Sequence, residues 1–250
     1  MKKLLLFLIT IFSVQYAWAE VSIQNDQQYF SEDGTLHIVG EIQNNFNVPL
    51  NQINVQAELF SNGNLVEIVE IPLMLNNIMP EMKAPFDLVV SGKDAKNIDE
   101  YSLKIFHKLT DPKSQVIDIT TSDMKIDNSD NLLITGTVVN HGDFTANSIV
   151  IVATLYDKNG KVMTAHKTHV EPDYLRAGED AFFFMSIPDK SFTNSIVDYS
   201  LVAESDEFTA VPEFPIGSTI LLASSVIAYL SLIKYSSRIT VNLVSAVNPK

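Results

Sequence analysis

The stretch Ile149-Val150-Ile151-Val152-Ala153-Thr154-Leu155-Tyr156 decides the fold. It is rich in β-branched residues, and every second side chain from Ile149 to Leu155 is apolar, which is typical of a strand with one buried face. Asn159-Gly160 follows, and a second apolar run covers residues 162–170. Because Asn-Gly supplies the positive φ that a tight turn needs, the stretch predicts a β-hairpin.

The same pattern occurs 96 residues earlier, where residues 53–60 precede Asn62-Gly63. The alignment continues upstream, with Leu36–Asn44 matching Leu132–Asn140. A match over roughly 50 residues without a gap indicates that a unit the size of a small domain has been duplicated. Gly40 and Gly136 lie in the middle of the matched strands and predict a bulge or a close backbone approach.

The alignment continues downstream at a nearly constant offset. Phe86 and Leu88 align with Phe182 and Phe184 at 96 residues, and residues 99–103 align with 197–201 at 98 residues. Two extra residues near 191–194 would explain the change of offset.

About seven short strands in each copy are typical of an immunoglobulin-like sandwich. The chain has no cysteine, so the Cys-Trp-Cys signature of that core is missing and the likeness concerns architecture only. We predict an all-β fold with two tandem Ig-like β-sandwich domains over residues 20–107 and 116–208. Residues 108–115, which include Pro112, form the predicted linker.

The strand Ala153-Thr154-Leu155-Tyr156-Asp157 resembles the motif that names the FxLYD family of small extracellular β-sandwich domains, with Ala in place of the Phe. The first copy has the weaker match Ala57-Glu58-Leu59-Phe60-Ser61. The resemblance covers about residues 30–107 and 126–205. It implies a fold and a surface location, and it implies no catalytic residue.

The first 19 residues have the three parts of a secretory signal peptide. Lys2 and Lys3 are the basic part, residues 4–14 are apolar, and Ala17-Trp18-Ala19 is an A-x-A cleavage motif. The apolar run is too short to span a bilayer. We expect cleavage after Ala19.

Residues 216–233 carry no charge and would rise about 27 Å as a helix, which is enough to span a membrane. Lys234 and Arg238 follow directly, and the positive-inside rule places them in the cytoplasm. The sequence therefore predicts one transmembrane helix, a cytoplasmic basic tail over residues 234–250, and a body outside the cell.

A Pro-containing spacer over residues 209–215 precedes this span and contains Pro212-Glu213-Phe214. These three residues, the apolar segment and the basic end resemble the PEF-CTERM sorting signal of archaeal surface proteins. The resemblance implies an archaeal source and an archaeosortase as a partner, which would cut near the motif and transfer the protein to a lipid. Residues 239–250 extend beyond the usual end of such a signal.

The charge of the chain lies in two different populations. The whole chain has 17 Lys plus Arg and 30 Asp plus Glu, for a net charge of −13. All 30 acids lie in residues 20–213 with 12 of the bases, so this body carries 12 − 30 = −18. That balance argues against nucleic acid as a partner. The absence of cysteine excludes disulfides, thiolate metal sites and a cysteine nucleophile.

Two groups of polar residues have alternative interpretations. His166 and His169 could hold a metal if they shared a helical face, but a strand puts them on opposite faces. The acidic group before the second repeat could bind calcium or form a solvated turn; it comprises Asp123, Asp127, Asn128 and Asp130. Glu179-Asp180 and Asp206-Glu207 are weaker cases of the same kind.

Met74, Met79 and Met82 could bind copper(I) or fill gaps in the core. The chain has no P-loop, G-x-G-x-x-G, H-E-x-x-H or G-x-S-x-G motif. We therefore expect no catalytic, cofactor-binding or metal-binding residue.

These observations favour a non-enzymatic protein of the archaeal cell envelope, held at the membrane and acting through its β-sandwich surfaces in adhesion, spacing or the binding of another envelope protein. The alternative is a solute- or metal-binding accessory module of a membrane complex. An enzyme with a site between the two domains is a third class.

Overall fold

The computed structural model describes residues 20–92, 95–187, 190, 193 and 195–210. The predicted signal peptide with Ala17 and Ala19, the motif Pro212-Glu213-Phe214, and the segment 216–250 with Lys234 and Arg238 lie outside these residues. Within them, no helix is long and apolar enough to cross a membrane.

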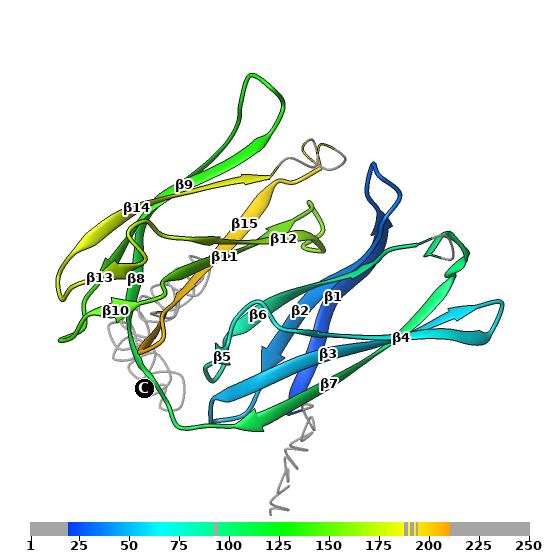
Figure 1. The fold of residues 1–250 in the computed structure, drawn as a ribbon, viewed down its shortest axis with the longest axis horizontal. Helices are drawn as coiled ribbons and strands as arrows, with labels where there is room; N and C mark the ends of the chain where they lie inside the picture. The colour runs from blue at the N-terminus through cyan, green and yellow to red at the C-terminus, as the bar shows by residue number, and fades with distance from the viewer. Residues whose placement is uncertain (1–19, 93–94, 188–189, 191–192, 194, 211–250) are drawn as a thin grey trace, which may run out of the picture. The chain divides into compact units, whose positions relative to one another are not determined.

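The first lobe consists of two groups of hydrogen-bonded strands around one apolar core (Figure 1). One sheet has the order β1-β2-β6, and the other has β4-β3-β7 with β5 paired to the start of β3. A short 3₁₀ helix, Ala95–Asn97, precedes the last strand. The strands are β1 (Val21–Phe30), β2 (Leu36–Asn44), β3 (Leu50–Ser61), β4 (Asn64–Pro72), β5 (Asn77–Ile78), β6 (Lys83–Val90) and β7 (Glu100–Leu109).

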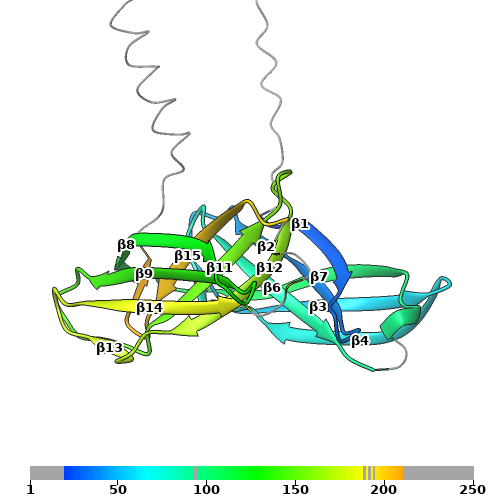
Figure 2. The same cartoon turned by 90° about the horizontal axis from the view of Figure 1, so that it is seen from above.

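The second lobe repeats this pairing, with β8-β9-β14 and β12-β11-β15 as its two groups of strands. Figure 2 shows β8, β9 and β14 as neighbours. A last short strand, β16, joins the groups by pairing with both β8 and β15. The strands are β8 (Ser114–Ile126), β9 (Leu132–Asn140), β10 (Ala146–Asn147), β11 (Val150–Tyr156), β12 (Val162–His169), β13 (Tyr174–Leu175), β14 (Asp180–Ile187), β15 (Asp198–Glu204) and β16 (Phe208–Ala210).

The predicted all-β class is confirmed for the described residues, which contain no α-helix and form sheets of the β-sandwich type. Two of the element boundaries differ from expectation. Strand β7 runs through Leu109 and β8 starts at Ser114, so strands enter the predicted linker from both sides. Thr209 and Ala210, expected in the spacer, belong to β16 because they continue the backbone pairing of the second lobe.

Each lobe contains a phenylalanine ring packed on a glycine. Gly40 pairs with Phe86 and Gly136 pairs with Phe183, and a Cβ at Gly136 would lie 2.6 Å from the Phe183 ring. The neighbouring strands β1 and β8 are bulged beside these glycines. The structure therefore combines the bulge and the close approach that the mid-strand glycines predicted.

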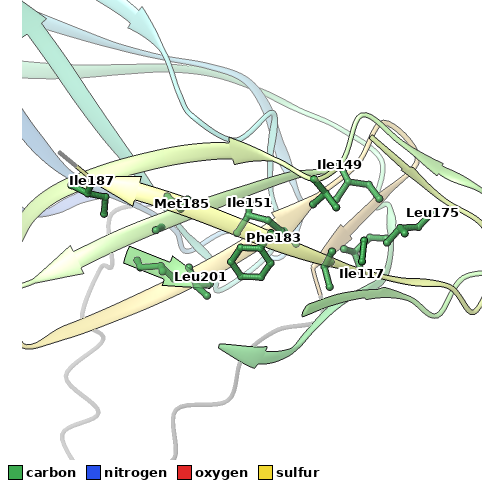
Figure 3. Packing of buried hydrophobic residues seen from close by; sticks show 14 of the residues in the cluster. Ile117, Ile149, Ile151, Leu175, Phe183, Met185, Ile187 and Leu201 are labelled. Atoms are coloured by element: carbon green, nitrogen blue, oxygen red, sulfur yellow. The ribbon is translucent and has the colours of Figure 1, made fainter. Parts of the chain in front are cut away.

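This pairing corrects the sequence alignment of the two copies. Phe86 corresponds to Phe183, not to Phe182, because each ring lies opposite the equivalent glycine. Phe183 is buried among Ile117, Ile151 and Leu201 (Figure 3), whereas Phe182 is 62% exposed. One extra residue between β11 and β14 causes the error, since a shift of one residue moves a side chain to the other face of a strand.

The two Asn-Gly pairs form different turns. Asn62 and Gly63 both have positive φ, at 51° and 75°, and Ser61 pairs with Asn64, as expected for a two-residue hairpin. In the second copy only Gly160 has positive φ, at 76°. There the Asp157 side chain accepts the backbone N–H groups of Asn159 and Lys161, so the turn is longer and is organised by the aspartate.

A fully buried asparagine ends the second strand of each repeat. The Asn44 Nδ2 donates to the carbonyls of Val48 and Ile78 at 3.0 and 2.9 Å, and its Oδ1 accepts the Phe46 N–H at 2.9 Å. Asn140 makes the same three bonds to the carbonyls of Phe144 and Leu175 and to the Gly142 N–H. The buried side chain therefore joins three parts of the backbone.

We expect Asn140→Ala to lower the free energy of unfolding by about 2–3 kcal/mol, because it removes three hydrogen bonds to the backbone and leaves the buried carbonyl of Leu175 without this partner. Urea denaturation followed by tyrosine fluorescence and circular dichroism measures the loss. Asn64→Ala, at an exposed turn position, is the control and should change stability by less than about 0.5 kcal/mol. Equal losses of stability in the two variants would show that the hydrogen bonds of the Asn140 amide do not stabilise the fold.

Candidate functional site

The two histidines of the H-x-x-H pattern lie in strand β12, three positions apart. Strand geometry directs side chains at that spacing to opposite faces, so the structure does not bring His166 and His169 together. Among the residues that the structure describes, no group of three His, Cys, Asp or Glu side chains could hold a metal ion.

The acidic group before β9 is used in its own turn. The Asp127 carboxylate accepts the backbone N–H of Ser129 at 2.7 Å and that of Asn131 at 2.9 Å, and it also accepts the Asn131 amide. These bonds, those from Asn131 first, hold the pKa of Asp127 below its ordinary value. Asp123 lies in β8, and Asp130 has a positive φ in the turn.

The other acidic pairs also accept hydrogen bonds from the chain itself. Glu179 accepts the Arg176 backbone N–H at 3.0 Å. Glu207 accepts the backbone N–H and the side-chain amide of Asn147 at 2.8 and 2.6 Å. The structure therefore assigns these carboxylates to loop geometry.

The three methionines are packing residues of the first lobe. Met79 is 5% exposed, and Met74 and Met82 pack partly buried against the first-lobe core. A thioether in such a position fills an irregular gap between other apolar side chains.

Two carboxylates lie buried where the lobes meet, and Glu41 on β2 is the first. It is 1% exposed, and its Oε1 accepts the hydroxyl of Tyr156, which ends β11 of the second lobe, at 2.5 Å. Lys83 lies 3.4 Å from Oε2 as a charge partner. Burial first, and then the Glu41 charge, raises the pKa of Tyr156, so its hydroxyl stays a protonated donor at neutral pH.

Glu204 on β15 is the second buried carboxylate, at 2% exposure. Its two oxygens reach into the first lobe and accept the backbone N–H groups of Asn76 at 2.7 Å and Asn77 at 3.3 Å. Burial raises the pKa of Glu204, and the two N–H groups and the charge of Lys167 oppose that rise. Lys167 itself donates to the Met74 carbonyl at 2.8 Å.

The contact between the lobes also has an apolar part. Val152 on β11 is 1% exposed and belongs to the first-lobe core cluster, and Val202 on β15 packs beside it. Gln27 on β1 donates to the Val162 carbonyl of β12 at 2.6 Å. Strand β11 is therefore buried on both faces, one toward its own core and one toward the first lobe.

The contact between the lobes was not predicted from the sequence, although one signal for it is present. A strand with one solvated face alternates, whereas residues 149–153 are apolar throughout, which is typical of a strand buried on both faces. The hydrophobic pattern of the sequence predicts that Glu41 and Glu204 are exposed. It therefore could not distinguish these two buried carboxylates from exposed ones.

Two open grooves lie on the surface. The larger, of about 470 Å³, is lined by Glu20, Val21, Ile23, Phe46, Leu103, Ile105 and His107. The smaller, of about 340 Å³, lies beside the buried Glu41–Tyr156 bond and is lined by Asn25, Lys83, Tyr156, Asp157, Lys158, Gly160, Val197 and Asp198. Both grooves are open to solvent, and polar residues form most of the lining of the second.

No protein-family model matches the chain, and no curated protein matches it significantly. Solved structures are similar to the chain only at low TM-scores. They include red sea bream transglutaminase at 8% identity, with 79% of this chain and 32% of that chain covered and a TM-score of 0.24. The exo-chitosanase CsxA of Amycolatopsis orientalis is 11% identical, with 76% and 26% covered and a TM-score of 0.28.

A third similar structure is β-glucuronidase 2 of Bacteroides uniformis, at 13% identity, with 75% and 27% covered and a TM-score of 0.26. The chain thus spans about a quarter to a third of the length of these enzymes. Scores this low carry no functional argument.

We expect Tyr156→Phe to lower the free energy of unfolding by about 1.5–3 kcal/mol, because it removes a hydrogen bond to a buried carboxylate. Chemical denaturation measures the change, with Tyr174→Phe at a 41% exposed position as the control. A loss no larger than that of the control would mean that the hydroxyl does not hold the lobes together.

Glu204 predicts a pH dependence. Because its pKa in the folded chain lies above the ordinary value of 4.5, the folded chain binds this proton more tightly than the unfolded chain. The resulting contribution to stability is fully present below pH 4.5 and is lost as the pH rises through the raised pKa.

A pH series of urea midpoints tests this expectation with Glu204→Gln, which cannot titrate. The stability of the native chain relative to Glu204→Gln should fall as the pH rises from 4.5. Glu67→Gln, at an exposed position of β4, is the matched control for the loss of one carboxylate. A native-to-variant difference that stays constant with pH would contradict the buried role of Glu204.

Proposed function

We propose that the two lobes are tandem Ig-like β-sandwich domains of a membrane-anchored protein of the archaeal cell envelope, outside the cell, which acts by binding or spacing other envelope proteins. The observation that carries the proposal is the use of the polar residues. The candidate ligands Asp127 and Glu179 bond within their own loops, Glu207 bonds to Asn147 on β10, and Glu41 and Glu204 join the lobes. What the described lobes offer to other molecules is surface, with two open grooves.

The end segments support the location. The signal-like residues 1–19 and the uncharged residues 216–233 with Lys234 and Arg238 are sequence features, and they predict export followed by retention at the membrane. The body charge of −18 between them suits a soluble face that anionic lipid headgroups repel.

Fractionation of cells that express the full chain tests the location. We expect the protein in the membrane fraction after an alkaline carbonate wash, and we expect protease added to intact cells to digest the lobes. A variant that lacks residues 216–233 should appear in the medium. Recovery of the native chain in the cytosol would overturn the proposal.

The intact mass of the mature protein tests the sorting signal. A species that ends at or before Pro215 with added lipid mass would support cleavage by an archaeosortase at the Pro212-Glu213-Phe214 motif. A species that starts at Glu20 and retains Lys250 would show a transmembrane anchor without sorting. Glu213→Ala should prevent processing. Glu171→Ala is the control, because Glu171 is also next to a proline, Pro172, but lies outside the motif.

A further inference from the structure

The larger groove lies between two strands that face each other without being paired. We call the space between β1 and β7 the first-lobe seam. Val21 and Ile23 of β1 and Leu103 and Ile105 of β7 line it. β1 pairs only with β2, and β7 pairs only with β3, so within the described chain one edge of each strand is free. Free edges can hydrogen-bond to an added strand.

One end of the seam is closed by a bond between the two sheets. The Tyr101 hydroxyl on β7 donates to Asp26 Oδ2 on β1 at 2.7 Å. The second lobe has the same closure, with the Tyr199 hydroxyl of β15 at 3.0 Å from Ser122 Oγ of β8. The groove of the first lobe begins beyond this bond and continues to Glu20 and His107.

In the second lobe the equivalent space is filled by the chain itself. Strand β16 runs parallel to β8 and antiparallel to β15 between them. The side chains that it covers are buried, with Ile117 and Ala203 at 0% exposure and Leu201 at 4%. The equivalent positions in the first lobe, taken from the strand registers, are Val21, Ile105 and Leu103. All three are only partly buried.

The hydrogen bonding at the mouth of the seam differs in the same way. Ser205, directly after β15, accepts the backbone N–H groups of Glu207 and Phe208 at 3.2 and 2.9 Å as the chain turns into β16. His107 holds the corresponding position in the first lobe. Its Nδ1 is buried and has no hydrogen-bond partner among the described residues, and the residue lines the groove.

The first lobe also limits the size of the side chain that an added strand can place at the position equivalent to Phe208. In the second lobe, Gly142 leaves room for the Phe208 ring, since a Cβ on Gly142 would lie 2.9 Å from that ring. The first lobe has Phe46 at the equivalent position, and its ring lies 5.7 Å from that of His107. Phe46 therefore takes the place of the Phe208 ring, and a small side chain is required where β16 has phenylalanine.

We propose that the first-lobe seam binds an extended segment of a separate protein, parallel to β1 and antiparallel to β7, with a small residue at the position of Phe208 and basic residues beside it. Glu20 is exposed at the mouth of the seam, and the body carries −18, so a cationic segment has the complementary charge. The inference rests on the proposed role as a binding protein and names the surface and the partner chemistry, but it does not depend on membrane attachment.

Peptides based on residues 203–210 are the probes. Both carry Lys in place of the three acidic residues; the Ala peptide has Ala at the position of Phe208, and the Phe peptide keeps the phenylalanine. We expect the full-length chain in detergent to bind the Ala peptide roughly tenfold more tightly, because a second ring overfills the seam. Phe46→Gly recreates the Gly142 arrangement and should reverse the preference. Fluorescence polarisation measures both affinities.

A thiol probe locates the binding without relying on Phe46→Gly. Because the chain has no cysteine, Ile105→Cys introduces a single thiol in the seam. The Ala peptide should slow its alkylation, while Phe182→Cys, on an exposed face of the second lobe, should react at an unchanged rate. A scrambled peptide should protect neither.

Three results would overturn the inference. The first is equal protection of both thiols by the Ala peptide, and the second is a peptide preference that Phe46→Gly leaves unchanged. The third is an Ile105→Cys thiol that resists alkylation without peptide, because that would mean that the chain already fills its own seam. None of these results bears on cell fractionation, so the inference about the seam can fail while the proposed location stands.

Discussion

The rest of the structure depends on a buried amide that has to satisfy the backbone around it. Asn44 and Asn140 have no exposed surface, and each binds two backbone carbonyls and one backbone N–H, of which the carbonyl of Ile78 or Leu175 is buried with it. The N–H that each one binds belongs to the residue at the rim of the seam, Phe46 or Gly142. The same interaction therefore fixes one rim in both lobes, and the identity of the residue held there decides whether an aromatic ring from a neighbouring strand can enter.

The two lobes have equivalent strand pairing in their cores, and they differ at their edges. Their cores keep the glycine under the phenylalanine ring and the tyrosine bond that closes the end of the seam. The second lobe is completed by β16, whereas in the first lobe the chain leaves β7 directly for β8. The lobes contact each other through the Tyr156–Glu41 hydrogen bond and through the bonds of Glu204 to the first lobe. These residues are not among the features that the two lobes share.

The strands could be predicted from the sequence because alternation and the Asn62-Gly63 turn are local signals. The correspondence of Phe86 with Phe183 could not, since one inserted residue changes the face without changing the composition. Strand β16 was also missed: three residues before a proline segment have no periodicity, and only their pairing with β8 defines them. The contact of Glu204 with the first lobe depends on residues 127 and 128 positions away, a separation over which no pattern is informative.

The parallel pairing of β16 with β8 has a mechanical consequence. The chain enters β8 from the first lobe and leaves the second lobe after Ala210, so a pull between these two points acts on opposite ends of parallel neighbours. Such a load is a shear, and it stretches the hydrogen bonds between the strands together, whereas a hairpin pulled from its open end breaks them one after another. The pairing of β16 with β8 therefore resists tension applied along the chain.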